Sequence, residues 1–102
     1  MSQEITKRSE IPDAPYYVLS NDTFMSGWGF AKGRINTIIL PCENLREARI
    51  VEWNAHQRTD QQRVRIVRHK PRIRDGVLYS LMNREEASRW YEPGGFAPTF
   101  EE

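Results

Sequence analysis

The sequence contains a single cysteine, Cys42, and no long hydrophobic run. A lone cysteine cannot form a disulfide within the chain, so the composition gives no sign of an oxidising compartment. No apolar stretch approaches the roughly 18 residues that a membrane-spanning helix needs, and the polar residues 1–10 lack the apolar core of a signal peptide. We therefore expect a cytoplasmic protein that does not bind membranes.

Large apolar side chains are also scarce, because Leu, Ile, Val and Phe together make up only 22 of the 102 residues. That share is close to the roughly 20% below which disorder is expected, but disorder also requires a high net charge, and the formal net charge here is +1. Aromatic residues make up 11% of the chain, and each buries a large area. We expect a single domain over residues 16–95, with a flexible N-terminal arm at 1–15 and a C-terminal tail at 96–102.

Residues with catalytic or metal-binding chemistry are few and widely spaced. Cys42, His56 and His69 show no metal-ligand spacing, and the sequence places no nucleophile beside a base. The carboxylates of Glu85 and Glu86 fall in the first turn of an expected helix, where they complement the helix dipole. We therefore expect a protein that is not an enzyme and has no metal or cofactor. A structure with Cys42 or a histidine in a polar cleft would count against this expectation.

Alternating and β-branched apolar residues predict strands over residues 16–19, 35–40, 63–67 and 77–81. The first is expected to end in a turn at residues 20–22 and the second at Pro41. The segment 24–33 has three glycines among apolar residues, which is typical of a twisted or bulged strand. The dipeptide Asp75-Gly76 predicts a hairpin that pairs residues 72–74 with residues 77–81.

The main helix is expected to run from Leu45 to about Arg58. Asn44 is a suitable N-cap, and Glu47 follows three residues later, as in a capping box. The apolar stripe that we expect to face the core comprises Leu45, Ala48, Val51 and Ala55.

A shorter helix is expected after Asn83, docked onto the core by Ala87, Trp90 and Tyr91. With the strands, this order of elements predicts an α+β fold. We expect a small, mostly antiparallel sheet with one main helix across a face and a short C-terminal helix.

Charge is sorted along the chain. Residues 63–74 carry six Lys or Arg residues and no acidic residue, whereas residues 75–102 carry six acidic residues and two arginines. On paired strands, alternate arginines would lie about 7 Å apart and could bind successive phosphates. Neighbouring aromatic rings, from among Trp28, Trp53, Tyr79 and Trp90, could stack on bases. The expected nucleic-acid-binding residues are Arg63, Arg65, Arg68, Lys70, Arg72 and Arg74.

Two other interpretations of the charged and glycine-rich segments stay open. The arginines of 63–74 could belong to a solvated sheet face and pair with the acidic C-terminal segment. Lys32 and Arg34 could hold an anion in the glycine-rich segment, although the strand that follows it is unlike the helix of a phosphate loop.

The outer side of the main helix carries an unusual pair of apolar residues, Ile50 and Trp53, which point away from the expected core stripe. Arg46 and Arg49 lie beside them, and this composition is typical of a protein-binding patch. The alternative is that the N-terminal arm or the C-terminal tail covers the pair.

The stretch Asn21–Gly29, which reads N-D-T-F-M-S-G-W-G, follows Tyr16 and Tyr17 and precedes a helix with Glu47, Ala48 and Val51. This pattern resembles small uncharacterised proteins of bacteriophages and prophages, over roughly residues 16–67. The resemblance implies a mobile-element origin and a host cytoplasm, but no function.

From these features we expect a binding module that engages nucleic acid through residues 63–74. The alternative is a protein interaction factor that modulates a host protein through Arg46, Arg49, Ile50 and Trp53.

Overall fold

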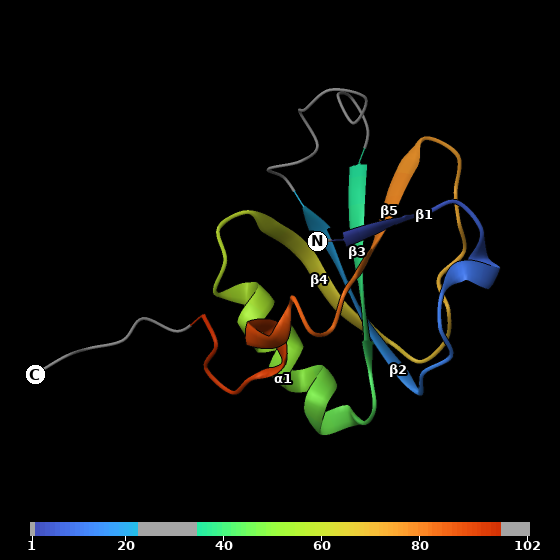
Figure 1. The fold of residues 1–102 in the computed structure, drawn as a ribbon. Helices are drawn as coiled ribbons and strands as arrows, with labels where there is room; N and C mark the ends of the chain where they lie inside the picture. Colours follow the sequence, from blue (N-terminus) through green and yellow to red (C-terminus); the bar gives the residue numbers. More distant parts are fainter. Residues whose placement is uncertain (1, 23–34, 97–102) are drawn as a thin grey trace, which may run out of the picture.

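The computed structural model describes residues 2–22 and 35–96, which form a mixed sheet with one helix on a face (Figure 1). The sheet order is β1-β5-β3-β2-β4; β3 and β5 are parallel, and all other neighbouring strands are antiparallel. This confirms the predicted α+β class with a mostly antiparallel sheet and one main helix. The strands and the α-helix are β1 (Ser2–Ile5), β2 (Tyr16–Asp22), β3 (Ile35–Cys42), α1 (Leu45–His56), β4 (Gln61–Val67) and β5 (Val77–Met82), and a 3₁₀ helix, η1 (Arg8–Glu10), follows β1.

The two central strands reach further than the sequence pattern predicts. β2 continues through the expected turn to Asp22, and β3 continues through Pro41 to Cys42. The pairing of β3 with β5 ends at Ile39, so only β2 lies beside β3 at the proline. A proline, which has no backbone N–H, is tolerated where one side of a strand is unpaired.

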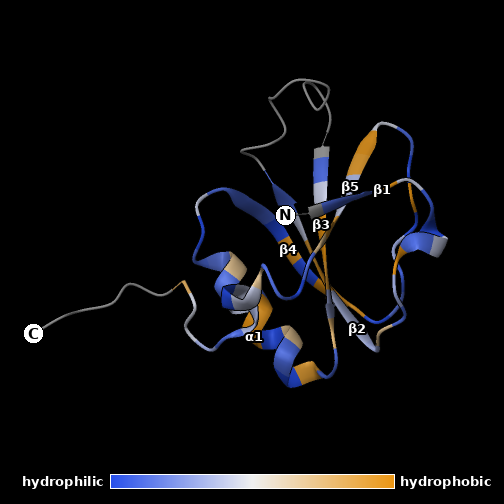
Figure 2. Cartoon of the chain, viewed as in Figure 1, coloured by the Kyte–Doolittle hydropathy of each residue, from blue (hydrophilic) through white to orange (hydrophobic). Residues whose placement is uncertain are grey.

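The first face of the sheet packs against α1. Val18 and Leu40 from the central strands form one cluster with Ala48, Val51 and Ala55 from the helix, and all five are buried. Figure 2 shows a hydrophobic stretch in β5, hydrophobic residues between hydrophilic ones in β4, and a helix α1 that is mostly hydrophilic with hydrophobic interruptions. This alternation is what a helix half-buried against a sheet requires.

Helix α1 begins where the sequence predicts. The Asn44 side-chain oxygen accepts a hydrogen bond from the Glu47 backbone N–H at 2.8 Å, while the Glu47 carboxylate accepts from the Glu43 backbone N–H at 3.0 Å. These bonds satisfy backbone donors that a helix N-terminus leaves without partners. The helix ends at His56, two residues before the predicted end.

The predicted core stripe of α1 is wrong at Leu45, which is 40% exposed. The buried arc of the helix is rotated toward Asn54, which is fully buried. The Asn54 amide donates hydrogen bonds to the backbone oxygens of Arg89, Trp90 and Glu92, at 3.3, 2.9 and 2.7 Å. The C-terminal segment thus packs on one side of α1 and leaves Leu45 on the other.

The second face of the sheet is covered by the N-terminal segment, and the prediction of a flexible arm over 1–15 is wrong for its described residues, 2–15. β1 pairs with β5, and both Ile5 and Ile11 are buried. The Tyr17 hydroxyl donates to the Pro12 carbonyl at 2.7 Å and accepts from the Ala14 backbone N–H at 3.0 Å. Two isolated isoleucines among polar residues therefore anchor the whole segment, because they fill the second core.

The predicted hairpin is also wrong. Asp75 and Gly76 do form a turn, with Gly76 at φ 80°, but residues 72–74 are not a strand. β5 pairs with β1 on one side and with β3 on the other, so it has no free edge for residues 72–74. Residues 68–76, which we call the crossing segment, instead pass across the second face, where Ile73 packs against the core.

The expected C-terminal helix is a 3₁₀ helix, η4 (Ser88–Tyr91), rather than an α-helix. Asn83 accepts hydrogen bonds from the backbone N–H groups of Glu85 and Glu86, and Trp90 is buried as predicted. Phe96 packs edge-on against Trp90 with ring centroids 5.2 Å apart, so it belongs to the domain and not to a tail.

The predictions for the glycine-rich segment 24–33, for an anion site at Lys32 and Arg34, and for residues 97–102 lie outside the described residues. Within the described ranges, no helix is long and apolar enough to cross a membrane.

Candidate nucleic-acid interface

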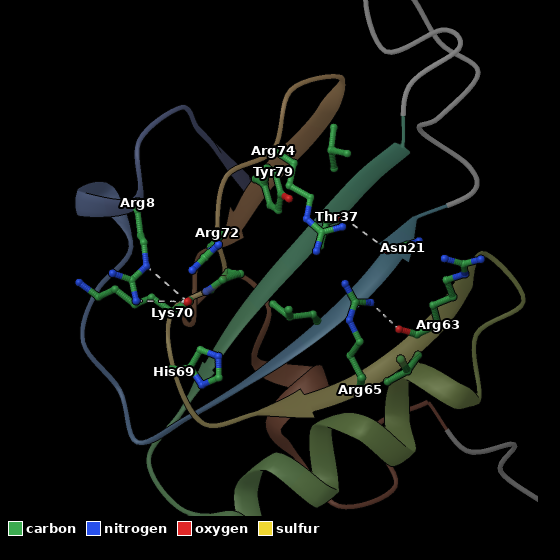
Figure 3. Close-up of a pocket in the computed structure, with 14 residues that line it drawn as sticks. Arg8, Asn21, Thr37, Arg63, Arg65, His69, Lys70, Arg72, Arg74 and Tyr79 are labelled. Atoms are coloured by element: carbon green, nitrogen blue, oxygen red, sulfur yellow. Dashed lines mark hydrogen bonds between the residues drawn. The ribbon is translucent and has the colours of Figure 1, made fainter.

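An open groove of about 980 Å³ lies on the second face of the sheet, between β4 and the crossing segment (Figure 3). Its floor comes from the central strands, and most of its polar lining is cationic. No acidic residue of the described chain lines it. The lining includes Leu19, Asn21, Thr37 and Tyr79 on the floor, Arg63, Val64 and Arg65 on β4, and Arg8, His69, Lys70, Arg72 and Arg74 on the other side.

A β-bulge shapes the β4 wall of the groove. Leu19 pairs with Arg65 and Asn21 pairs with Gln62, so two residues of β4 lie opposite one residue of β2. Arg63, inside the bulge, has φ 52°, which is a left-handed backbone conformation that side chains other than glycine, asparagine and aspartate rarely adopt. Bulges of this kind redirect side chains and occur often beside binding sites.

The bulge holds the Arg65 side chain in place. Its Nη1 donates a hydrogen bond to the Arg63 carbonyl oxygen at 2.7 Å, as the dashed line in Figure 3 shows. Desolvation by the groove walls lowers the pKa of Arg65; Tyr79 opposes that shift, and the positive charges of Arg63 and Arg74 add to it. Burial is the main cause of the lowered pKa, and the charges of Arg63 and Arg74 are smaller contributions to it.

The opposite wall is the crossing segment, and it is fastened to the N-terminal segment. The Lys70 ammonium forms an ion pair with Asp13 at 2.9 Å, and the Arg8 guanidinium donates two hydrogen bonds to the Lys70 carbonyl at 3.4 Å. Arg8 was missed by the sequence analysis, because it lies in a segment that was expected to be flexible. The crossing segment carries Arg72 and Arg74 into the groove.

The structure gathers five of the six predicted basic residues, and Arg68 does not join them. The Arg68 guanidinium lies 5.5 Å from the centre of the Tyr16 ring. It lines a separate shallow depression with Leu45 and Arg49 from the helix. The five residues that line the groove are Arg63, Arg65, Lys70, Arg72 and Arg74.

The alternative that these arginines pair with the acidic C-terminal segment is not seen in the described part of the chain. Arg84 pairs with Glu47 and Arg58 pairs with Asp60, while in residues 63–74 only Lys70 has an ion-pair partner within the described ranges. That partner, Asp13, comes from the N-terminal segment. Among the described residues, no carboxylate forms an ion pair with Arg63, Arg65, Arg72 or Arg74.

Aromatic rings do not add a stacking surface to the described part of the groove. Tyr79 lines the floor but is only 5% exposed, and Trp90 is buried beside the helix. Trp53 lies on α1, on the other side of the sheet, and Trp28 lies outside the described residues. The lining is therefore suited to phosphate groups and not to exposed bases.

The predicted patch on α1 is present in part. Trp53 is 45% exposed, Arg46 and Arg49 are exposed, and Ile50 is half-buried. The C-terminal segment packs beside Asn54 and does not bury Trp53.

Few side chains with catalytic or metal-binding chemistry lie in the described part of this site. His69 lines this polar groove, which is the observation that we expected to count against a non-enzymatic protein; within the described residues, however, no thiol or carboxylate lines the groove with it. Burial, with the charge of Glu47 as a further cause, raises the pKa of Cys42 to about 12, and the thiol is therefore a poor nucleophile. The described residues include no cluster of three or more His, Cys, Asp or Glu side chains that could hold a metal.

Comparison of the chain with protein-family models, with curated proteins and with solved structures finds no match.

Proposed function

We propose that this protein binds nucleic acid through the groove between β4 and the crossing segment. The observation that carries the proposal is that the guanidinium groups of Arg63, Arg65, Arg72 and Arg74 line one groove, and none has a carboxylate partner among the described residues. Arginine binds phosphate through two parallel hydrogen bonds, so such a lining favours a chain of phosphates.

The interaction would be mainly electrostatic. Phosphate contacts release counterions, so the affinity should fall steeply between about 50 and 200 mM salt. Because contacts to phosphates carry no sequence information, binding should depend little on base sequence.

The test is retention of a duplex oligonucleotide by wild-type protein and by the variants Arg65→Glu and Arg72→Glu. We expect both variants to weaken binding by tenfold or more at low salt, for every oligonucleotide sequence, because they reverse a charge inside the groove. Arg46→Glu is the matched control, since it makes the same change of charge on the helix side of the sheet. Equal affinity of wild type, Arg65→Glu and Arg72→Glu would rule the proposal out.

A second candidate function is capture of a protein partner by the α1 patch of Arg46, Arg49, Ile50 and Trp53. The exposure of Trp53 favours it, since a large exposed aromatic ring beside arginines is typical of binding hot spots. The resemblance to phage and prophage proteins leads us to propose a host protein as that partner. Trp53→Ala should abolish co-purification of a host protein and leave the unfolding free energy within about 1 kcal/mol of wild type. Loss of stability without loss of the partner would contradict this function.

A further inference from the structure

We infer that Arg65 and Arg74 form a two-arginine clamp for a single phosphate group, with Arg65 as its preorganised anchor. This inference deepens the proposed function and rests on the same groove. The proposed function requires only that the groove be positively charged, whereas the clamp is one defined anion site within it. Its ligand would be a phosphate monoester or diester.

The first support is the fixed position of Arg65. A long arginine side chain loses conformational entropy when a ligand orders it, and this loss weakens binding. Here the Arg65 Nη1 already donates to the Arg63 carbonyl at 2.7 Å, so part of that ordering is present in the unliganded protein. One hydrogen bond leaves the other guanidinium N–H groups of Arg65 available, because a guanidinium has five N–H donors.

The second support is the conformation of Arg63. A non-glycine residue at φ 52° costs free energy, and such residues are found most often where a site needs an unusual backbone. The strained residue supplies the carbonyl oxygen that orients Arg65. The bulge therefore holds the Arg65 guanidinium over the floor of the groove.

The third support is convergence from the opposite wall. Figure 3 shows Arg74 extending from the crossing segment toward the space that Arg65 enters from β4. Their positive charges repel each other, and within the described residues no carboxylate forms an ion pair with either. An anion between the two guanidinium groups would relieve that repulsion and accept hydrogen bonds from both.

The same clamp chemistry could receive phosphate from a nucleic-acid backbone or from a phosphorylated small molecule. The proposed function identifies the backbone as the source. The neighbouring cations Arg63 and Arg72 would then contact adjacent phosphates, while Arg65 and Arg74 hold the central one.

The experiment follows the arginine Nε–H resonances during titration with inorganic phosphate at low ionic strength, in wild-type protein and in Arg65→Gln, Arg74→Gln and Arg68→Gln. In wild type, we expect saturable shifts at Arg65 and Arg74 and little change at Arg68. Arg65→Gln and Arg74→Gln should each weaken phosphate binding by about tenfold or more, as loss of a charged hydrogen-bond donor does. Arg68→Gln is the matched control, because this residue belongs to the same basic stretch but faces the helix side.

Equal phosphate affinity in wild type and Arg65→Gln, or saturable shifts at Arg68 as large as those at Arg65, would overturn the clamp. Far-ultraviolet circular dichroism checks that each variant is folded; if Arg65→Gln is unfolded, Arg74→Gln in the crossing segment decides the question.

A duplex oligonucleotide added to the phosphate-bound protein separates the two proposals. Displacement of phosphate supports both, whereas a clamp that binds phosphate but no oligonucleotide overturns only the nucleic-acid function. If Arg65→Gln leaves the oligonucleotide affinity unchanged while Arg72→Glu lowers it, the nucleic-acid function stands and only the clamp is overturned.

Discussion

At the scale of single residues, two polar side chains use backbone carbonyls to fix distant parts of the chain. Asn54 reaches the backbone oxygens of Arg89, Trp90 and Glu92 and so ties the C-terminal segment to α1. Arg65 uses the carbonyl of Arg63 to hold its own guanidinium in the groove. In both cases a hydrogen bond to a backbone carbonyl positions the polar side chain, and the spacing of apolar residues in the sequence does not predict such a bond.

Arg63 allows a direct test of stored backbone strain. We expect Arg63→Gly to raise the free energy of unfolding by about 0.5–1 kcal/mol, because glycine adopts φ 52° without the steric cost of a Cβ atom. Oligonucleotide affinity should fall in the same variant, since it loses one cation of the groove. Urea denaturation measures the first effect and a salt-dependent retention assay the second.

Gln62→Gly is the control for that substitution. Gln62 neighbours Arg63 in β4 and does not have a positive φ, so glycine there should lower the free energy of unfolding by about 0.5–1 kcal/mol. Destabilisation of similar size in both variants would show that the bulge stores no strain.

At the scale of elements, the N-terminal segment is part of the folded core. Ile11 is buried although its neighbours are exposed, and β1 forms one edge of the sheet. We expect Ile11→Ala to lower the free energy of unfolding by about 2–4 kcal/mol, as removal of a buried isoleucine side chain does. Lys7→Ala, at an exposed position of the same segment, should change it by less than about 0.5 kcal/mol.

Urea denaturation of both variants measures the difference. A flexible arm would give two equal, near-zero effects, and the packing of the second face as described would then be incorrect. Because Arg8 and Asp13 fasten the crossing segment, Ile11→Ala should also weaken binding in the groove, through the position of its wall.

The edge strand β4 has a structural role as well as the proposed binding role. It lies at the end of the sheet order, and charged side chains and bulges on edge strands discourage pairing with other chains. Arg63 and Arg65 serve that purpose wherever their guanidinium groups point. Protection of the edge strand does not explain why Arg63 and Arg65 line the same groove as Arg74.

At the scale of the whole molecule, carboxylates on several elements are stabilised in their charged form. The Arg58 hydrogen bonds lower the pKa of Asp60, the Lys70 hydrogen bond lowers that of Asp13, and backbone hydrogen bonds from Thr6 and Lys7 lower that of Glu10. These three carboxyl groups therefore bind protons less tightly in the folded state than in the unfolded chain. Stability from these groups is therefore fully present above their ordinary pKa values of 3.8 to 4.5 and is lost as the pH falls through the lowered values.

Urea midpoints between about pH 7 and pH 2.5 should be flat near neutrality and fall below about pH 4.5. Asp60→Asn should lower the midpoint at pH 7 and flatten the acid limb, because Asp60 forms two hydrogen bonds to Arg58, at 2.9 and 2.6 Å. An acid limb with the same slope in wild type and Asp60→Asn would show that this pair contributes nothing to the pH dependence.

Much of the local structure follows from the sequence alone. The Asn44 cap and the start of α1, the strands 35–40 and 63–67, the turn at Asp75-Gly76 and the burial of Trp90 are all set by residues close in the chain. The concentration of positive charge in 63–74 is likewise a property of the sequence. Local propensity, capping and charge act over a few residues, so they can be recognised without knowing the fold.

Only the tertiary structure decided where that charge lies. The strand order places β4 and β5 near opposite edges, so the basic stretch crosses the second face, while Arg68 remains on the helix side and Arg8 joins from the N-terminal segment. The bulge at Arg63 arises from the register between β2 and β4. Strand order and register depend on pairings between residues far apart in the chain, and a pattern of neighbouring residues does not determine those pairings.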